Sequence, residues 1–303
     1  MGKNSQLEIG GLKLNVSNLD KIFYPKTGFT KGEVIEYYIK ISPYLLPHLK
    51  NRPISLKRYP DGVKGFFFYE KQCPPHRPAW LKTANVPRKD GSEINYCVMN
   101  DLPALVWAAN LADLELHTFL HRAPAIDRPL AVAFDLDPGP PADIVLCCQV
   151  AIWLRELFSR WKLEAFPKTS GSKGLQVYVP LNTPVAYEKT KAFAHTVAQR
   201  LEKEFPQAVV SNMQKSLRGG KVLVDWSQND QHKTTVSVYS LRAKEHPTVS
   251  TPVTWGEVAA ALKKKKSKFL TFEAAEVLKR VEKLGDLFGP VLKLKQKLPV
   301  HLS

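Results

Sequence analysis

Two aspartates lie two residues apart at the end of an apolar run, in the segment 131–139, AVAFDLDPG. A short apolar run closed by Pro-Gly is typical of a strand end, and residues two apart in a strand point to the same face. We therefore expect Asp135 and Asp137 to project together from the edge of a sheet. Paired carboxylates repel each other unless a cation lies between them, and Mg²⁺ and Mn²⁺ prefer carboxylate oxygen. The pattern is compatible with a metal site that acts on phosphates. Considered alone, it is better explained by a strand end with two solvated acids, and only residues further along the chain favour the metal site.

A third acid, Asp225, ends the apolar segment 222–226, VLVDW, much later in the chain. Nucleotidyl transfer with two metal ions needs carboxylates that bridge both ions, so that one ion activates the attacking 3′-hydroxyl and the other holds the triphosphate. Asp225 could complete such a set with Asp135 and Asp137. Considered alone, Asp225 is better explained as a solvated residue at a strand end.

The segment 168–174, KTSGSKG, lies between an expected helix and an expected strand. Gly-rich turns expose backbone N–H groups that bind phosphate, and Lys173 would add positive charge. The segment is not a Walker A loop, because no helix follows it and the spacing of that motif is absent. A plain flexible turn explains the segment equally well at this point.

Basic and aromatic side chains occur together at 57–59, KRY, and at 66–71, FFFYEK. Single-stranded and terminal nucleotides are bound by cations combined with rings on which bases stack. The alternative is a place in the core, which we expect for at least one of Phe66 to Phe68. His117 alternates with Glu115 and Phe119 in an expected strand, where a lone histidine is more often structural than catalytic.

The composition is that of a globular protein with an affinity for polyanions. The 303 residues include 44 Lys and Arg against 28 Asp and Glu, a net charge of +16, and nucleic acid is the first candidate for a partner of such a chain. A membrane is a weaker candidate, because no long apolar helix is expected. Because the four cysteines form no C-x-x-C pair, we expect buried free thiols in a reducing cytosol and no zinc site.

Strand and helix patterns alternate irregularly along the chain. A hairpin is expected at 7–16, around two glycines, and Thr30 with Glu33 has the pattern of a capping box that opens a helix with a break or kink at Pro43. Further helices are expected at 101–111, 143–161, 187–205, 254–262 and 271–284, and further strands at 54–59, 114–121, 175–180, 222–226 and 234–241. This order lacks strict βαβ alternation and predicts an α+β fold with mixed or antiparallel sheets.

Taken in order, these segments closely resemble the polymerase domain of bacterial ligase D, a member of the archaeo-eukaryotic primase superfamily. The resemblance extends from about residue 18 to about residue 286. The strings that carry it are SNLDKIFYP, TKGEVIEYY, LKRYPDGV, LELHTF, FDLDPG, KTSGSKGL, KSLRGGKVLVDWSQN, KTTVSVYSLRA and HPTVSTPVTW. Each string is weak alone, and the ordered set is very specific.

The resemblance implies roles for particular residues. The catalytic acids, which bind the metal ions, would be Asp135, Asp137 and Asp225. The residues around the incoming nucleotide would be Lys57, His117, Ser170, Lys173, Arg218 and Arg242. Contacts to DNA would come from Asn18, Lys21 and Lys31 at a 5′-phosphate and from Phe68 and Tyr69 near the templating base. Gln176 stands where the family usually has histidine, and we assign it no catalytic role because glutamine cannot carry charge or donate a proton.

The fold that the resemblance implies is a single primase-polymerase domain over residues 1–303. Its N-terminal α/β module would cover about 1–125 and a catalytic module with a sheet similar to the RNA-recognition fold about 126–290, followed by a short C-terminal tail. The active cleft would lie between the two modules.

The implied function is that of a nucleotidyltransferase in bacterial non-homologous end joining, a primase-type DNA-repair polymerase. It would add ribo- or deoxyribonucleotides to 3′ ends, fill short gaps with two Mn²⁺ or Mg²⁺ ions, and have terminal transferase activity. The implied partners are DNA with 5′-phosphorylated ends or gaps, NTP or dNTP, Ku and an ATP-dependent DNA ligase. The protein would be cytoplasmic and nucleoid-associated in a prokaryote, without a membrane, and a monomer or a pair across a break.

Two other classes of function stay open. A metal-dependent nuclease would use the same acids with water as the nucleophile, but it would not need the set of triphosphate-binding residues. A non-catalytic protein that bridges DNA ends would need only the basic surface, and it would keep its full function after Asp135→Ala.

Overall fold

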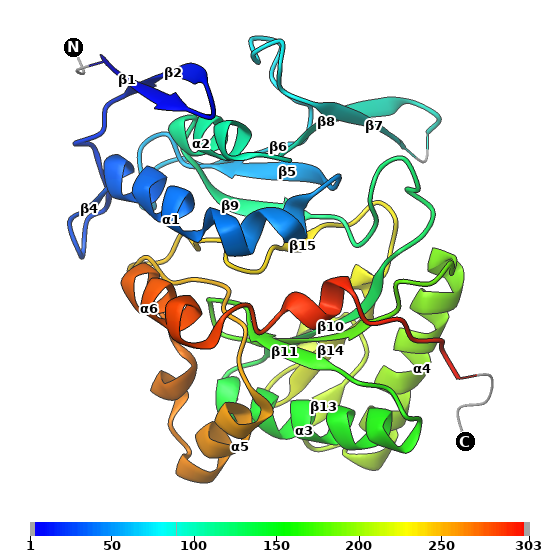
Figure 1. The fold of residues 1–303 in the computed structure, drawn as a ribbon. Coiled ribbons are helices and arrows are strands. Elements are labelled where there is room, and N and C mark those ends of the chain that lie inside the picture. Colours follow the sequence, from blue (N-terminus) through cyan, green and yellow to red (C-terminus); the bar gives the residue numbers. More distant parts are fainter. Residues whose placement is uncertain (1–3, 89, 300–303) are drawn as a thin grey trace. The chain divides into compact units, whose positions relative to one another are not determined.

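The computed structural model describes residues 4–88 and 90–299, which form two compact units (Figure 1). The first unit contains the described residues up to Pro124, together with Thr234–Ser250 and Phe272–Gly285. The second contains Ala125–Lys233, Thr251–Thr271 and the described residues from Asp286 on. The chain therefore changes units near residue 125, where a module boundary was expected, and returns twice to the first unit. The assignment of the whole chain to one domain stays a prediction.

The first unit is built on a six-stranded sheet, with two small hairpins and three helices beside it (Figure 1). The sheet has the order β15-β9-β5-β8-β7, and β6 pairs with β5. The strands of this unit are β1 (Asn4–Ile9), β2 (Leu12–Ser17), β3 (Ile22–Tyr24), β4 (Phe29–Thr30), β5 (Pro53–Arg58), β6 (Phe68–Glu70), β7 (Thr83–Pro87), β8 (Glu93–Val98), β9 (Asp113–Thr118) and β15 (Thr235–Val236). Its helices are α1 (Lys31–Leu49), α2 (Leu102–Asn110) and α6 (Ala274–Leu284).

The expected N-terminal hairpin and the start of α1 are both present. Gly10 and Gly11 connect β1 to β2 with φ angles of 57° and 76°, which glycine adopts without a steric penalty. Thr30 and Glu33 exchange their side-chain hydrogen bonds with the backbone, so the predicted capping box is confirmed.

The expected break at Pro43 is absent, because α1 runs from Lys31 to Leu49 as one helix, and the kink given as its alternative stays a prediction. A proline removes the N–H that would bond to the carbonyl four residues earlier, here that of Ile39. The hydroxyl of Ser42 donates to this same carbonyl at 2.8 Å. A neighbouring side chain therefore satisfies the acceptor that the proline leaves unpaired.

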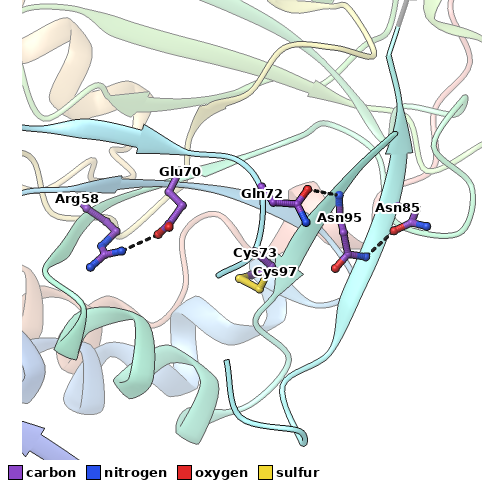
Figure 2. The surroundings of a disulfide bond; sticks show 7 residues. All are labelled: Arg58, Glu70, Gln72, Cys73, Asn85, Asn95 and Cys97. Carbon is purple, nitrogen blue, oxygen red and sulfur yellow. Dashed lines mark hydrogen bonds and ion pairs between the residues drawn. A yellow bond between two sulfur atoms is a disulfide. The ribbon is translucent and has the colours of Figure 1, made fainter. Parts of the chain in front are cut away.

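The cysteines divide differently from the sequence expectation. Cys147 and Cys148 are free and buried, as predicted, but Cys73 and Cys97 form a disulfide (Figure 2). The backbone N–H of Cys73 donates to the carbonyl of Asn95 at 2.6 Å, which brings the segment after β6 beside β8. The two cysteines are 24 residues apart, and the spacing alone could not reveal this pairing.

The second unit is built on a five-stranded sheet of order β11-β12-β10-β14-β13, with α3 and α4 packed against it (Figure 1). All neighbours are antiparallel except β13 and β14. The strands are β10 (Ala131–Pro138), β11 (Phe166–Thr169), β12 (Leu175–Pro180), β13 (Val209–Val210) and β14 (Val222–Asp225). The α-helices are α3 (Ile144–Arg160), α4 (Tyr187–Glu204) and α5 (Trp255–Lys264), and the 3₁₀ turns are η1 (Lys215–Leu217), η2 (Trp226–Gln228), η3 (Ser267–Leu270) and η4 (Gly289–Leu292).

Helices and sheets are mixed in both units, so the α+β expectation is confirmed. The central strand β10 is buried between β12 and β14, with Phe134 and Leu136 fully buried. Within residues 4–88 and 90–299, no helix has the length and apolar character needed to span a membrane.

Candidate functional site

The three predicted acids gather on two neighbouring strands of the second unit. Asp135 and Asp137 both lie on β10 and are partly exposed, whereas Leu136 between them is fully buried. Asp225 is the last residue of β14 and is the direct cross-strand partner of Asp135. The alternation predicted from the sequence is therefore present, and the pairing of β10 with β14 brings the third acid to it.

The pKa of the Asp135 carboxyl is raised to about 6, mainly by burial and then by the negative charge of Asp225. A hydrogen bond from Gln176 and the charge of Lys168 act in the opposite direction. Gln176 lies opposite Asp135 on β12, so it touches the acid cluster although the sequence assigned it no catalytic role. Gln176 and Lys168 do not offset the combined effect of burial and the charge of Asp225, because the pKa remains raised. A bound cation would favour the ionised form of Asp135.

Asp225 is held by the turn that follows it. Its Oδ1 accepts hydrogen bonds from the backbone N–H of Ser227 at 2.9 Å and from the hydroxyl of Ser227 at 2.6 Å. Its Oδ2 accepts from Nε2 of Gln228 at 3.0 Å. These bonds make Asp225 the cap of η2 and fix the direction of its carboxylate.

Asp137 is paired with two of the predicted nucleotide-binding cations. Its oxygens lie 3.1 Å from Nζ of Lys173 and 3.6 Å from Nη1 of Arg218. Two glycines allow this close approach: a Cβ at Gly139 would lie 2.0 Å from the carbonyl oxygen of Arg218, and one at Gly174 would lie 2.3 Å from that of Leu136. The Pro-Gly stop and the Gly-rich turn are therefore packing requirements around the acids.

The hydroxyl of Ser170 organises the turn that carries Lys173. It accepts the backbone N–H groups of Ser172 at 3.2 Å and Gly174 at 3.1 Å. Lys173 is exposed at 60% of its side chain, so its ammonium is accessible to a ligand. Whether Ser170 binds nucleotide stays a prediction.

The donor set of the acid cluster fits a hard divalent cation. Across the described ranges 4–88 and 90–299, no three His, Cys, Asp or Glu side chains already converge as a preformed metal centre. Asp137 and Asp225 direct their oxygens to protein donors instead. Three carboxylates on adjacent strands, one of them with a raised pKa, are nevertheless the ligands that Mg²⁺ and Mn²⁺ prefer.

A second charged cluster, in the first unit, is centred on Glu115 of β9. Its buried carboxylate lies 3.0 Å from Nε2 of His117, 3.3 Å from Nε of Arg242 and 3.5 Å from Nζ of Lys57. The backbone N–H of Ala243 donates to the same carboxylate at 3.0 Å. One acid therefore gathers three of the predicted nucleotide-binding residues.

Burial alone would raise the pKa of Glu115, but the hydrogen bond from His117 and the charges of Arg242 and Lys57 hold it well below its usual range. The pKa of His117 is lowered, first by burial and then by the same two cations, against the pull of Glu115. At neutral pH His117 is therefore neutral and donates its Nε2–H to the ionised Glu115. Sequence reasoning missed Glu115, although its alternation with His117 was a usable signal.

The expected group of cations and rings is present beside this cluster. Nζ of Lys57 lies 4.7 Å from the ring centroid of Phe67 and 5.3 Å from that of Tyr69, and the Arg58 guanidinium lies 5.2 Å from that of Phe68. Phe66 is 72% exposed and Tyr69 51%.

The expectation that at least one of Phe66 to Phe68 belongs to the core is wrong. Phe66 and Phe67 are exposed, and Phe68 is only half-buried. They precede or begin β6, a short strand that pairs with β5 alone, so one side of the segment is left open to solvent.

The residues expected at a 5′-phosphate lie together at the start of α1. The carbonyl of Asn18 accepts the N–H of Lys21, and Nζ of Lys21 lies 2.7 Å from Asp61. Lys31 is buried, with its ammonium donating to the carbonyl of Ser17 and to Asn110, each at 2.7 Å. Burial, followed by the charge of Lys21, lowers the pKa of Lys31 to about 8. Lys31 already has two acceptors, whereas Lys21 is exposed and could exchange Asp61 for a phosphate.

Comparison with known proteins gives one consistent family. The model for the primase-polymerase domain of LigD matches residues 30–288. The multifunctional non-homologous end joining protein LigD of Mycolicibacterium smegmatis is 41% identical over 281 residues, 92% of this chain and 36% of that protein. The bifunctional non-homologous end joining protein LigD of Bacillus subtilis is 32% identical over 95% of this chain and 46% of that protein. This chain thus spans between a third and a half of the length of these relatives.

A solved structure shares the fold. The polymerase domain from Mycobacterium tuberculosis ligase D in complex with DNA superimposes with a TM-score of 0.86 at 38% identity, over 93% of this chain and 99% of that one. The expected primase-polymerase fold is thereby confirmed.

Proposed function

The chain belongs to the LigD primase-polymerase family, and from this membership and the two charged clusters we propose that it is a template-directed polymerase that repairs DNA ends by two-metal nucleotidyl transfer. The observation that carries the proposal is the pairing of Asp135 with Asp225 across β10 and β14, with Asp137 two residues further along β10. Carboxylates in this arrangement can hold metal ions for a reaction in which a hydroxyl loses its proton and the charge of the leaving pyrophosphate is neutralised.

In this proposal Asp135, Asp137 and Asp225 would hold two ions, Mn²⁺ or Mg²⁺. Such ions would supply a lower pKa of the 3′-hydroxyl and positive charge for the triphosphate. If Asp137 held a cation, its ion pairs with Lys173 and Arg218 would be given up, and the two positive charges would be available for the triphosphate. This exchange links metal binding to nucleotide binding, because the same carboxylate cannot satisfy both partners.

The cluster around Glu115 would contribute the other nucleotide contacts. Lys57, His117 and Arg242 are held by one buried carboxylate, so their positions are set before a ligand binds. Three groups share a single negative charge, and positive potential remains for an anionic ligand. Ser170 would join them through its hydroxyl, which in the protein alone accepts the N–H groups of Ser172 and Gly174.

The DNA contacts come from two further groups in the proposal. Phe68 and Tyr69 offer rings for stacking next to a template base, supported by Arg58 and Lys57. Asn18, Lys21 and Lys31 form the 5′-phosphate pocket at the N-terminus of α1, where the helix dipole also favours an anion.

The finer features of the function rest on the family. We propose that the protein accepts ribo- as well as deoxyribonucleotides, extends 3′ ends with terminal transferase activity, and acts with Ku and an ATP-dependent DNA ligase. We also propose that it works in the bacterial cytoplasm at the nucleoid, as a monomer or as a pair across a break.

Primer extension on gapped DNA tests the proposal, with each NTP and dNTP in Mg²⁺ and in Mn²⁺. We expect nucleotide-dependent extension that Asp135→Ala abolishes, with ribonucleotides accepted in Mn²⁺. Shortening of the DNA without added nucleotide would instead identify a nuclease. Unchanged end-bridging by Asp135→Ala, without extension by the wild type, would identify a non-catalytic bridging protein. A clear preference for deoxynucleotides in Mn²⁺ would contradict the proposed substrate range.

A further inference from the structure

The amide side chain of Asn229 connects the two strands that carry the acids. Asn229 is fully buried and follows η2, four residues after Asp225. Its Oδ1 accepts the backbone N–H of Ala133 at 2.9 Å, and its Nδ2 donates to the carbonyl of Ala133 at 2.8 Å. Ala133 lies on β10, two residues before Asp135.

These two bonds replace a missing part of the sheet. β14 pairs with β10 from Val222 to Asp225, and continuing its register would bring Ser227 opposite Ala133. The chain instead turns into η2 directly after Asp225. The N–H and carbonyl of a buried strand residue need partners, and a side-chain amide has an N–H and a C=O that point the same way, as those of one residue of a facing strand do.

The departure of β14 is what makes the acid cluster possible. Because the chain turns at Asp225, that carboxylate can cap η2 through Ser227 and Gln228 and stay beside Asp135. A third bond, from Nδ2 of Asn229 to the carbonyl of Trp226 at 2.9 Å, fixes the turn itself. Asn229 thereby ties the turn that orients Asp225 to the strand that carries Asp135.

We propose that Asn229 is a positioning residue for metal binding, which sets the spacing of the Asp135 and Asp225 carboxylates without touching the ion. This inference rests on the proposed function, since it assumes that the acids hold divalent cations. Partners that orient metal ligands from outside the coordination shell contribute strongly to metal affinity.

The chain offers a matched control in Asn182, in the same unit. Its Nδ2 also donates to two backbone carbonyls, those of Val291 at 3.0 Å and Leu294 at 2.8 Å. Asn182 lies two residues after β12, and its N–H bonds to the carbonyl of Leu130, just before β10 begins. It therefore belongs to the end of these strands away from the acids. Its φ of 46° disfavours alanine, so Asn182→Ala is a demanding control for stability.

The experiment measures Mn²⁺ affinity by electron paramagnetic resonance of the free ion, with thermal unfolding of the metal-free protein beside it. We expect Asn229→Ala to weaken Mn²⁺ binding by about tenfold or more, whereas Asn182→Ala lowers the melting temperature and leaves Mn²⁺ affinity unchanged. Extension by Asn229→Ala should recover as Mn²⁺ is raised, because the defect is in binding.

Asn229→Asp keeps the size of the side chain but loses both N–H donors, and it decides the question if Asn229→Ala does not fold. Mn²⁺ affinity equal to wild type in the folded variant would overturn the proposal and leave Asn229 a residue of stability alone. If the wild type itself neither binds Mn²⁺ nor extends primers, the proposed function fails instead, so the two failures are distinguishable.

Discussion

The two charged clusters of this protein treat buried acids in opposite ways. In the second unit Asp135 is largely, though not fully, removed from solvent and lies beside the like charge of Asp225, and its pKa is raised to about 6. In the first unit Glu115 is also buried, but one hydrogen bond from His117 and two cations hold its pKa below the usual range. The negative charge beside Asp135 is not offset unless a cation binds. Glu115 has two cationic partners, so one positive charge in its cluster is not neutralised. Burial alone therefore does not decide the state of a carboxyl; the sign of its neighbours does.

The largest expected effect comes from Asp135→Asn. Extension should be lost almost completely, as it should for Asp137→Ala and Asp225→Ala, and a double variant should lose little more because the acids act as a unit. The metal-free protein should nevertheless become more stable at neutral pH. Raising the carboxyl pKa from 3.8 to about 6 corresponds to a cost on the order of 2–3 kcal/mol for the ionised form.

The pH dependence of the free energy of unfolding distinguishes an effect of the Asp135 charge from an effect of packing. Because the folded state holds the proton of Asp135 more tightly, stability falls as pH rises from about 4 to about 6. The gain from Asp135→Asn should therefore be present at pH 7 and absent at pH 4, measured by urea unfolding without metal. Asp137→Asn is the contrast, because it removes the partner of Lys173 and Arg218 and should give no gain. Equal gains in stability from Asp135→Asn and Asp137→Asn would contradict the claim that the raised pKa of Asp135 destabilises the metal-free protein.

Glu115→Gln should have the opposite effect on stability. It leaves Lys57 and Arg242 buried or half-buried without their counter-charge, and breaking such a buried pair typically costs about 3–5 kcal/mol. Since the folded state holds the Glu115 pKa low, this stabilisation is fully present above the usual glutamate pKa, and it is lost gradually as pH falls from there through the much lower pKa of the folded state. Denaturant unfolding at pH 7 and at pH 3.5 measures the loss caused by Glu115→Gln and its partial decrease in acid.

The control for Glu115 is Glu36→Gln on α1. Glu36 pairs with Lys40 at 2.6 Å, but both side chains are exposed, and such surface pairs contribute about 0–1 kcal/mol. A loss for Glu115→Gln no larger than that of the control would mean that Lys57, Arg242 and His117 do not depend on the carboxylate. Nucleotide KM should rise in Glu115→Gln more than kcat falls, because the contacts it positions are proposed to bind the triphosphate.

Opening the Cys73–Cys97 disulfide should affect the first unit selectively. The bridge closes a loop of 24 residues and ties the segment after β6 to β8, which corresponds to about 3 kcal/mol in the chain-entropy account. Cys73→Ser with Cys97→Ser should lower the melting temperature and weaken DNA binding, because β6 carries Tyr69. Mn²⁺ affinity should not change, since the acids lie in the other unit. The Cys148→Ala variant, which removes a buried thiol outside any disulfide, is the control. A shift in Mn²⁺ affinity on opening the bridge would contradict the independence of the two units.

Features that depend on neighbours in the sequence were predictable, and those that depend on neighbours in space were not. Alternation gave the common side of Asp135 and Asp137, and the spacing of Thr30 and Glu33 gave the start of α1. The pairing of Asp225 with Asp135 spans 90 residues of chain and was reached only through the family resemblance.

Three misses have the same physical origin. The disulfide depends on the pairing of two distant segments, and the unbroken α1 depends on Ser42 taking the acceptor beside Pro43. Glu115 has its role because Arg242, far along the chain, returns to β9. In each case the residue could be seen in the sequence, but the residue that it contacts in the folded chain could not be predicted.

The smallest expected effect concerns the 5′-phosphate and its dependence on pH. Lys31 is buried beside Lys21, so its pKa is lowered to about 8 and part of its charge is lost just above neutral pH. A phosphate dianion would stabilise the charged form, so its binding should be accompanied by proton uptake, and the preference for phosphorylated gapped DNA should shrink from pH 7 to pH 9. The ratio of Kd values for gapped DNA with and without the phosphate measures this directly.

In Lys21→Ala/Lys31→Ala the ratio should approach one at both pH values, whereas Lys40→Ala, on the exposed side of the same helix, should keep the wild-type ratio. Extension on a simple primer-template at saturating enzyme should change little. Equal loss of affinity for both DNAs in the double variant would make these lysines general backbone contacts, and the phosphate would then have to be bound elsewhere, with Lys21 remaining the partner of Asp61.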